Sequence, residues 1–274
     1  MKVKRNEVTA ELVGLSFGDG GLTPRKGTRK MRFQLKGHLV EDREHYDNYI
    51  LPLFNKEIMF PIFRRKVGIV FNKNKNIYGL TVESVKIEKY LNYLGIPSGA
   101  KKELYIPKWI KENKKYSLKF LRGFFDTDGC LSCQRNYSIK NNKLHTQIRL
   151  YLACCSKNLM EEIYNILRSL GFKCSFTIYK KRRPWRDLYL VKLSGGIQVE
   201  RWFKLSGSKN PKHITKYLIW KRFGFCPPYT NLSERKRILK KEISPNSCYA
   251  RVPERSNGLE RYYQNLSQAK DLVA

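Results

Sequence analysis

The chain has 274 residues, and its 55 lysines and arginines against 23 aspartates and glutamates give a formal net charge of +32. This excess is far more than solubility requires. It predicts a polyanionic partner, with nucleic acid first, because phosphates neutralised by a protein release their counterions. No apolar run approaches the ~20 residues of a membrane-spanning helix, which disfavours a membrane partner. Seven scattered cysteines are not typical of a secreted disulfide framework, so we expect a cytoplasmic, nucleoid-associated protein, or an organellar one in a eukaryotic host.

The first predicted element is an apolar helix that ends at an acid. Residues 12–20 read LVGLSFGDG, with Asp19 in the eighth position. Asn6 is a residue type that caps helices, and we expect it to begin this one. Gly14 and Gly18 stand four residues apart, on one helix face, where small residues let a second helix backbone approach closely.

A strand with one polar face is predicted next. In residues 29–35 the apolar side chains of Met31, Phe33 and Leu35 alternate with polar ones, the signature of a half-buried strand. A helix is expected over residues 42–54, with Asp42 as its acidic cap, and another over 84–94, closed by Gly95. The stretch 96–106 (IPSGAKKELYI) then joins the two halves of the chain.

The acid-tipped pattern returns in the second half. Residues 121–129 read LRGFFDTDG, in which Asp128 occupies the place of Asp19, and Ser117 is expected to cap this helix. The alternating strand pattern returns over residues 147–152, 175–179 and 188–193, with a helix over 156–170 between the first two. The last two strands form a hairpin with a basic tip (KKRRPWR, residues 180–186).

The outward faces of these strands carry hydrogen-bonding and basic side chains, which suit the reading of base edges in a major groove. For any single strand the alternative is a solvated sheet face. The residues expected to contact DNA are Lys30, Arg32, Gln34, Lys36, His38, Gln147, Arg149, Tyr151, Thr177, Tyr179, Lys181, Arg182, Arg183 and Arg186.

Two equivalent halves predict an α+β fold with antiparallel sheets. If the two acid-tipped helices pack on each other, Asp19 and Asp128 lie side by side. Two carboxylates beside phosphates would repel unless a divalent cation sat between them, and Mg²⁺ is held by one or two carboxylates plus substrate oxygens. The pattern therefore indicates metal-assisted phosphodiester hydrolysis.

The paired motifs LVGLSFGDG and LRGFFDTDG resemble those of single-chain LAGLIDADG homing endonucleases. The resemblance also covers the segments YIPKWI and GSKNPKHITKY, and so most of residues 6–215. It implies two pseudo-symmetric αββαββα repeats whose sheets form a saddle over DNA, over residues 1–105 and 106–215. A short helical extension is expected over 216–249, and a poorly ordered tail over 250–274.

The resemblance also implies an activity. A monomer would make a staggered double-strand break in a long, pseudo-palindromic DNA target, as in the homing of mobile introns. Mg²⁺ or Mn²⁺ would be bound by Asp19 and Asp128, with Gly18 and Thr127 in the same metal site. Lysines near the scissile phosphates would stabilise charge or orient water. The candidates are Lys101, Lys102 and Lys209.

Several points stay open at the level of sequence. The polar residue that ends the first strand in the family could be His38, Gln34 or Glu41, whereas the second half offers only Cys154 and Cys155. The sixth motif position is Phe17 in the first copy and Asp126 in the second, which puts helix-end packing in doubt.

A second functional class is a non-cleaving binder on the same fold: a maturase that binds intron RNA, or a DNA-binding regulator. Retention of both Asp19 and Asp128 favours cleavage, because a pure binder has no chemical need for two interfacial acids. Cys130 and Cys133 form a CxxC pair, but no second ligand pair follows at a spacing typical of zinc sites.

Overall fold

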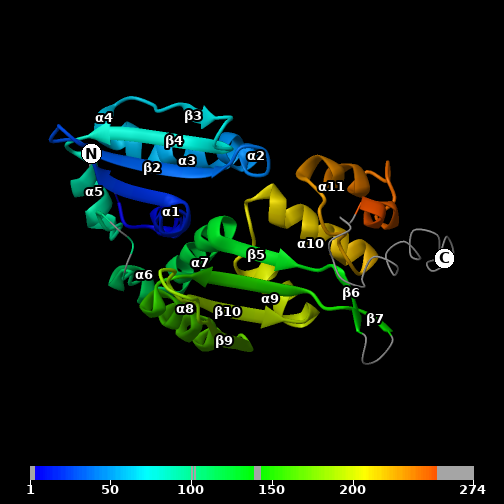
Figure 1. The fold of residues 1–274 in the computed structure, drawn as a ribbon. Coiled ribbons are helices and arrows are strands. Elements are labelled where there is room, and N and C mark those ends of the chain that lie inside the picture. The colour runs from blue at the N-terminus through cyan, green and yellow to red at the C-terminus, as the bar shows by residue number, and fades with distance from the viewer. Residues whose placement is uncertain (1–3, 100, 102, 139–142, 252–274) are drawn as a thin grey trace.

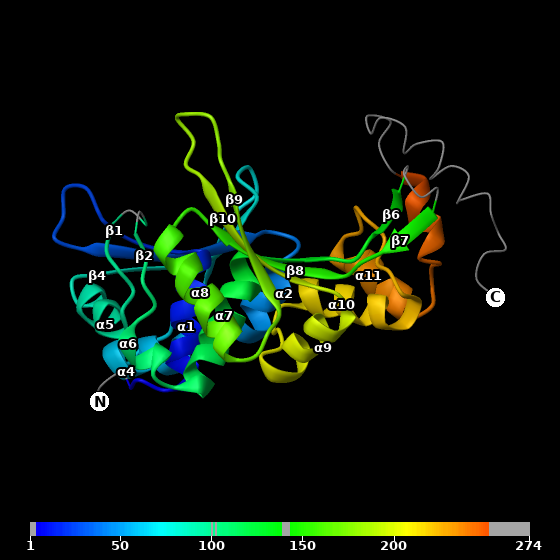
Figure 2. The ribbon, with the colours of Figure 1, turned by 90° about the horizontal axis from the view of Figure 1, so that it is seen from below.

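Two four-stranded antiparallel sheets flank a central pair of helices, α1 and α7 (Figure 1). The computed structural model describes residues 4–99, 101, 103–138 and 143–251. Helices cover one side of each sheet, and the strands leave the other side open (Figure 2). The predicted α+β class with two antiparallel sheets is confirmed.

The first half follows the order helix, two strands, helices, two strands, helix. Its sheet has the order β1-β2-β4-β3, and the alternation predicted around residue 33 is present, because Phe33 and Leu35 are fully buried. Its elements are α1 (Glu7–Gly18), β1 (Gly20–Pro24), β2 (Met31–His38), a helical segment of α2 (Arg43–His45), α3 (Leu51–Phe54) and α4 (Phe60–Phe63) joined by π-helical turns at Tyr46–Ile50 and Asn55–Met59, then β3 (Ile69–Asn72), β4 (Ile77–Ser84) and α5 (Ile87–Leu94).

The second half repeats this order with one addition. A separate two-stranded hairpin, β6 with β7, is inserted between the strands β5 and β8 of its sheet, whose order is β5-β8-β10-β9. This insertion departs from the simple repeat that the sequence predicted. The elements are α6 (Lys108–Lys111), α7 (Lys114–Asp128), β5 (Gly129–Ser132), β6 (Arg135–Ser138), β7 (Lys143–Thr146), β8 (Arg149–Cys154), α8 (Lys157–Ser169), β9 (Cys174–Tyr179), β10 (Leu188–Ser194) and α9 (Gly196–Leu205).

The two central helices begin at asparagine caps. The Asn6 side chain accepts a hydrogen bond from the Thr9 amide, and Thr9 returns one to the Asn6 amide, so the predicted cap of α1 is confirmed. The predicted cap of α7 is wrong. Asn113 begins that helix by accepting from the amides of its first turn, whereas the Ser117 hydroxyl donates to the Ile110 carbonyl, 2.9 Å away.

The C-terminal extension packs beside the second sheet and also touches the first half (Figure 1). It contains α11 (Leu232–Leu239) and a 3-10 turn over Asn246–Arg251. The Asn210 cap starts α10 (Pro211–Phe223), which runs across the boundary expected at residue 216. The expectation of a poorly ordered tail falls mainly on residues 252–274, outside the described residues.

The extension is tied to the first half by a buried ion pair. Arg235 of α11, which is 1% exposed, donates to Glu41 at the end of the first half's sheet. The amide of Leu232 donates to the same carboxylate, 2.9 Å away.

Among the described residues, no helix combines the length and apolar character needed to cross a bilayer.

Close approach of α1 and α7 is the central packing feature, and the prediction from small residues is confirmed. A Cβ atom on Gly14 would lie 2.1 Å from the Phe120 carbonyl oxygen, and one on Gly123 would lie 2.3 Å from the Glu11 carbonyl oxygen. Both distances are far inside van der Waals contact. The two backbones therefore touch where only glycine fits.

We expect Gly14→Ala to destabilise the protein by about 1–3 kcal/mol, because the added methyl group must push two helix backbones apart. Alanine forms helices better than glycine by about 1 kcal/mol, so helix propensity alone would predict that Gly14→Ala stabilises the protein. A measured loss of stability would therefore come from the packing. Urea unfolding measures it. Gly21→Ala is the matched control, since a Cβ there meets nothing within 4 Å. Equal effects at both positions would contradict the packing argument.

Candidate active site between the two halves

The helix ends bring the two motif acids together. Asp19 is the C-terminal cap of α1, and Asp128 is the last residue of α7. The Asp128 carboxyl carbon lies 3.2 Å from the position that a Cβ on Gly18 would occupy, and the Thr127 hydroxyl lies 2.0 Å from it. Gly18 and Thr127 thus face each other beside the acids.

Both carboxyl groups are held away from their ordinary ionisation. Burial, then the charges of Asp128 and Asp42, raise the pKa of Asp19 to about 7. Burial also raises the pKa of Asp128 to about 6, against the lysine charges of Lys101 and Lys212. A cation between them would offset the repulsion.

Lys101 lies directly beside this pair. Its ammonium group donates to the carbonyl oxygens of Phe17 and Gly18, at 2.8 and 2.7 Å, at the end of α1. Burial lowers the pKa of Lys101, while Asp128 and Asp19 act to raise it. The structure therefore places this candidate at the acids. Lys102, the neighbouring candidate, lies outside the described residues.

In the second half Lys212, not Lys209, has its charge near the acids. The Lys209 amide donates to Asp126, and its ammonium lies 5.7 Å from the centre of the Tyr49 ring. Lys212 instead lowers the pKa of both Asp19 and Asp128. The two lysines are three residues apart in GSKNPKH. Lys209 precedes α10, whereas Lys212 lies in its first turn, because the helix begins at Pro211.

A further carboxylate, the buried Asp42, orders this side of the site. It accepts from the Lys212 ammonium at 3.0 Å, from the Asn210 side-chain amide at 2.8 Å and from the His38 backbone amide at 2.9 Å. Burial acts to raise its pKa, but these three partners outweigh burial and lower it. Sequence reasoning had treated Asp42 as a helix cap. The structure gives its side chain no capping bond.

The candidates for the polar end of the first strand have different partners in the structure. The His38 ring accepts from the amides of Val40 and Glu41, at 3.2 and 3.1 Å, and contacts the Asn76 side chain, so it fixes a turn. Glu41 binds the extension. In the second half, Cys154 lies near Asp128 and Lys101, and burial raises the pKa of its thiol to about 11.

The sixth motif positions stabilise the two helix ends in different ways. Phe17 packs edge-on against Phe120 with ring centres 5.4 Å apart. Asp126 is fully buried and accepts from the Ser208 hydroxyl at 2.5 Å and from the Lys209 amide at 2.7 Å. Burial raises the pKa of Asp126 to about 7. Its carboxyl group thus anchors the loop that leads to Lys212.

His213 is part of the core. Its ring centre lies 4.3 Å from that of Phe125, with the two planes tilted by 32°, and the residue is 1% exposed. Neither ring nitrogen has a hydrogen-bond partner among the described residues. Burial holds its pKa well below the usual value, so this histidine is neutral and structural.

The open face of the first sheet carries the predicted polar row. Arg32, Gln34 and Lys36 of β2 are partly exposed, opposite the buried Phe33 and Leu35. Arg32 is not a free cation, because its guanidinium binds Glu83 across the strand pair at 2.7 Å. Lys30 lies just before β2 and is exposed.

The second sheet continues this polar face. Arg149 donates to the side-chain carbonyl of Gln147, so these two act as one unit, next to Tyr151 on the same strand. Thr177 and Tyr179 lie on β9. The basic hairpin tip beyond them projects on the open side of the sheets (Figure 2) and exposes Lys181, Arg182, Arg183 and Arg186.

The acids fit a magnesium or manganese ion that also binds substrate. No group of three or more His, Cys, Asp or Glu side chains could hold a metal ion among the described residues. Two carboxylates with raised pKa values nevertheless supply the hard oxygen ligands and uncompensated charge that Mg²⁺ needs when DNA phosphates complete its shell.

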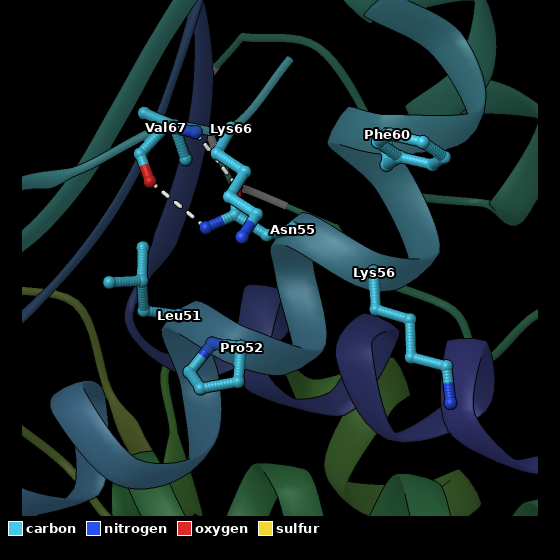
Figure 3. Close-up of a pocket in the computed structure, with 7 residues that line it drawn as sticks. All are labelled: Leu51, Pro52, Asn55, Lys56, Phe60, Lys66 and Val67. Atoms are coloured by element: carbon cyan, nitrogen blue, oxygen red, sulfur yellow. Dashed lines mark hydrogen bonds between the residues drawn. The ribbon is translucent and has the colours of Figure 1, made fainter. Parts of the chain in front are cut away.

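A hollow on the first half is not part of this site. It measures about 580 Å³ and is lined by helix residues and by the loop before β3 (Figure 3): Leu51, Pro52, Asn55, Lys56, Phe60, Lys66 and Val67. Those helices cover the core side of the sheet, since Phe54 of α3 stacks on Phe33 of β2. The hollow therefore faces away from the polar strand face.

We expect the metal-free protein to lose stability as pH rises from about 4 to 7. The folded pKa of Asp19 is about 7 against an ordinary value of 3.8, so the folded state binds the extra proton and its advantage disappears as that proton is lost. Urea unfolding in EDTA at pH 5 and pH 8 measures this. The change should be smaller in Asp19→Asn. An equal change in both proteins would contradict the assignment.

Comparison with known protein families identifies one domain in the second half of the chain. Residues 115–207 match the family model of a LAGLIDADG-like domain. The chain is similar to the solved structure of I-DmoI in complex with DNA and Mn, with 21% sequence identity, 73% of this chain and 96% of that chain covered, and a TM-score of 0.52.

A second solved structure covers nearly the whole chain. The meganuclease I-SmaMI bound to uncleavable DNA is 11% identical over 96% of this chain and 98% of that chain, with a TM-score of 0.51. The resemblance found in the sequence is confirmed: this chain contains a LAGLIDADG-like domain and has the two-motif LAGLIDADG meganuclease fold.

Proposed function

We propose that the protein is a site-specific homing endonuclease that makes a staggered double-strand break in a long, pseudo-palindromic DNA duplex. The observation that carries this proposal is the adjacent pair Asp19 and Asp128 at the ends of the two central helices, one half-buried and the other exposed, whose carboxyl groups have raised pKa values. The pair sits at the junction of two sheets whose open faces are polar and basic. The I-DmoI and I-SmaMI structures, which contain DNA, support DNA as the partner.

DNA binding in this proposal is the work of the sheets. Each half grips one half-site through its open strand face, and the net charge of +32 supplies affinity through counterion release. Phosphate contacts fix the register, and side chains such as Gln34 and Arg149 read base edges. Binding should therefore weaken steeply as salt concentration rises.

Hydrolysis is the work of the helix ends. Asp19 and Asp128 would hold Mg²⁺ or Mn²⁺, which supplies Lewis-acid activation of a phosphodiester and of water when bound. Lys101 and Lys212 place positive charge beside the acids, where they stabilise negative charge that develops on phosphate oxygens. Asp42 positions Lys212 by its ion pair. Each half contributes one motif acid to the shared centre, in a single-chain, monomeric protein.

A non-cleaving binder, such as an intron RNA maturase or a DNA-binding regulator, is the alternative. Its fold would gain nothing from two adjacent carboxylates at the helix ends, because like charges this close cost free energy when both groups ionise. In the cleavage proposal the two carboxylates hold a divalent cation, whose charge offsets that cost. Cleavage and RNA binding are also compatible in one chain.

The test uses a plasmid that carries the DNA flanking this gene with the intervening sequence removed. Purified protein is incubated with it in Mg²⁺, in Mn²⁺ and in EDTA, and linear product is mapped at both ends. We expect a single break with short overhangs in either metal and none in EDTA. Tight, sequence-specific binding without nicking in any metal would establish the binder instead.

A further inference from the structure

The tip of the β9–β10 hairpin exposes a tryptophan that has no role in the fold. The ladder between the two strands ends at the pair Tyr179 and Leu188, and the residues between them form a turn closed by the Trp185 amide, which donates to the Arg182 carbonyl at 3.1 Å. The Trp185 side chain is 72% exposed. Within the described part of the chain, its ring has no aromatic or hydrogen-bond partner.

The other three tryptophans behave differently. Trp202 is fully buried, the Trp109 indole donates to the Leu94 carbonyl at 3.2 Å, and Trp220 packs on Tyr217. A large indole left in water loses the favourable burial that such side chains normally gain. Trp185 is therefore better explained by a partner than by stability.

The surroundings of Trp185 specify that partner's charge. The tip carries five exposed basic residues and one acid, Asp187, which accepts from the Lys181 amide at 3.1 Å. Beside the indole is an open hollow of about 310 Å³. The basic residues of the tip are Lys180, Lys181, Arg182, Arg183 and Arg186.

The tip is also linked to the active site. Arg186 donates to the Lys101 carbonyl at 3.2 Å, and the Lys101 ammonium holds the last carbonyl groups of α1 beside Asp19. The hairpin projects on the open side of the sheets (Figure 2), so its tip rises beside any duplex that lies across them. These contacts would fix the position of a ligand bound by Trp185 relative to Asp19 and Asp128.

We propose that Trp185 is a DNA-contacting residue whose indole packs against bases of the bound duplex within a groove, while the neighbouring arginines and lysines hold the phosphates. This inference rests on the proposed DNA-binding function and deepens it. Aromatic and apolar side chains contact bases by stacking or by insertion at a base step, and such contacts need an exposed ring delivered by cationic neighbours. An acidic protein surface would satisfy the charges but would not place a base on the ring.

The test compares wild type, Trp185→Phe and Trp185→Ala with a duplex of ~40 base pairs that carries the insertion junction, in EDTA so that no strand is cut. The difference between the wild-type and Trp185→Phe emission isolates the Trp185 signal. We expect that signal to shift to shorter wavelength or to be quenched on binding. Trp185→Ala should weaken affinity about 10-fold, and Trp185→Phe less.

The salt dependence separates a base contact from an indirect role. Trp185→Ala removes no charge, so the slope of log Kd against log salt should stay as in wild type, whereas Arg183→Ala should reduce it by about one unit if Arg183 binds a phosphate. Phe60→Ala, an exposed aromatic residue on the helical side, is the matched control and should bind as wild type.

The outcomes are distinct. If wild type binds the duplex but Trp185 emission does not change and Trp185→Ala keeps full affinity, the inference is wrong and the proposed function stands. A changed salt slope in Trp185→Ala would also overturn it, because the ring would then act by positioning arginines. If wild type binds no duplex, the proposed function itself fails. A dye-labelled acidic peptide that binds in place of DNA would reassign the tip to a protein partner.

Discussion

Asp19→Asn and Asp128→Asn should each reduce double-strand cleavage by roughly 10³-fold or more while leaving DNA affinity nearly unchanged. Asparagine keeps the shape of the side chain but removes the charge that holds a divalent cation, and several kcal/mol of lost charge stabilisation correspond to that factor in rate. Neither acid lies on the strand faces that are proposed to bind DNA. Single-turnover cleavage and a binding titration, measured on the same duplex, separate the two effects.

The two acid variants should also differ from each other. The halves are unlike at their helix ends, since Lys101 holds carbonyl groups in the first half and Asp126 holds a loop in the second. We therefore expect unequal residual nicking of the two strands. Asp47→Asn is the control, because Asp47 binds the Tyr78 hydroxyl at 2.6 Å, away from the motif acids. Full cleavage by Asp19→Asn would remove that residue from the chemistry.

Arg122→Met should destabilise the protein by about 3–5 kcal/mol. Arg122 of α7 donates to both carboxylate oxygens of Glu11 on α1, and the Tyr49 hydroxyl donates to the same carboxylate at 2.8 Å. Glu11 is only 2% exposed, so removal of its partner leaves a buried charge in the seam between the halves. Urea unfolding at pH 7 measures the loss.

The double variant Glu11→Leu/Arg122→Met provides the matched test of this explanation. It removes both charges, so most of the stability lost in Arg122→Met should return. Lys119→Met, which breaks only an exposed 4.0 Å pair with Glu7, should cost less than about 1 kcal/mol. If the double variant were as unstable as Arg122→Met, lost packing would be the cause instead.

The central helices and the strand alternation could be predicted because they depend on short-range pattern. Gly14 and Gly123 mark close contact wherever they lie, and Met31, Phe33 and Leu35 must turn toward the same core. These features alone are enough to predict that Asp19 and Asp128 lie side by side. Lys101 differs from them, because only the family resemblance predicts a lysine in its loop, and the structure places its ammonium at the end of α1.

The remaining site residues could not be predicted, because they depend on contacts between distant segments. Asp42 looked like a helix cap, and only the approach of Asn210, 168 residues away, makes it a ligand for Lys212. The choice between Lys209 and Lys212 depends on where α10 begins. Ser117 and Asn113 are both good caps, and the chain direction after α6 decides between them.

The Glu11–Arg122 pair determines which half can associate with which. Within the repeat, Glu11 corresponds to Phe120, and Arg122 corresponds to Val13. In a symmetric dimer of two second halves each Arg122 would therefore meet a phenylalanine, and in a dimer of two first halves each Glu11 would meet a valine. Both arrangements bury an unpaired charge. If the chain were divided within its connecting loop, the two pieces would select each other over their own copies, so the seam itself keeps the two halves different.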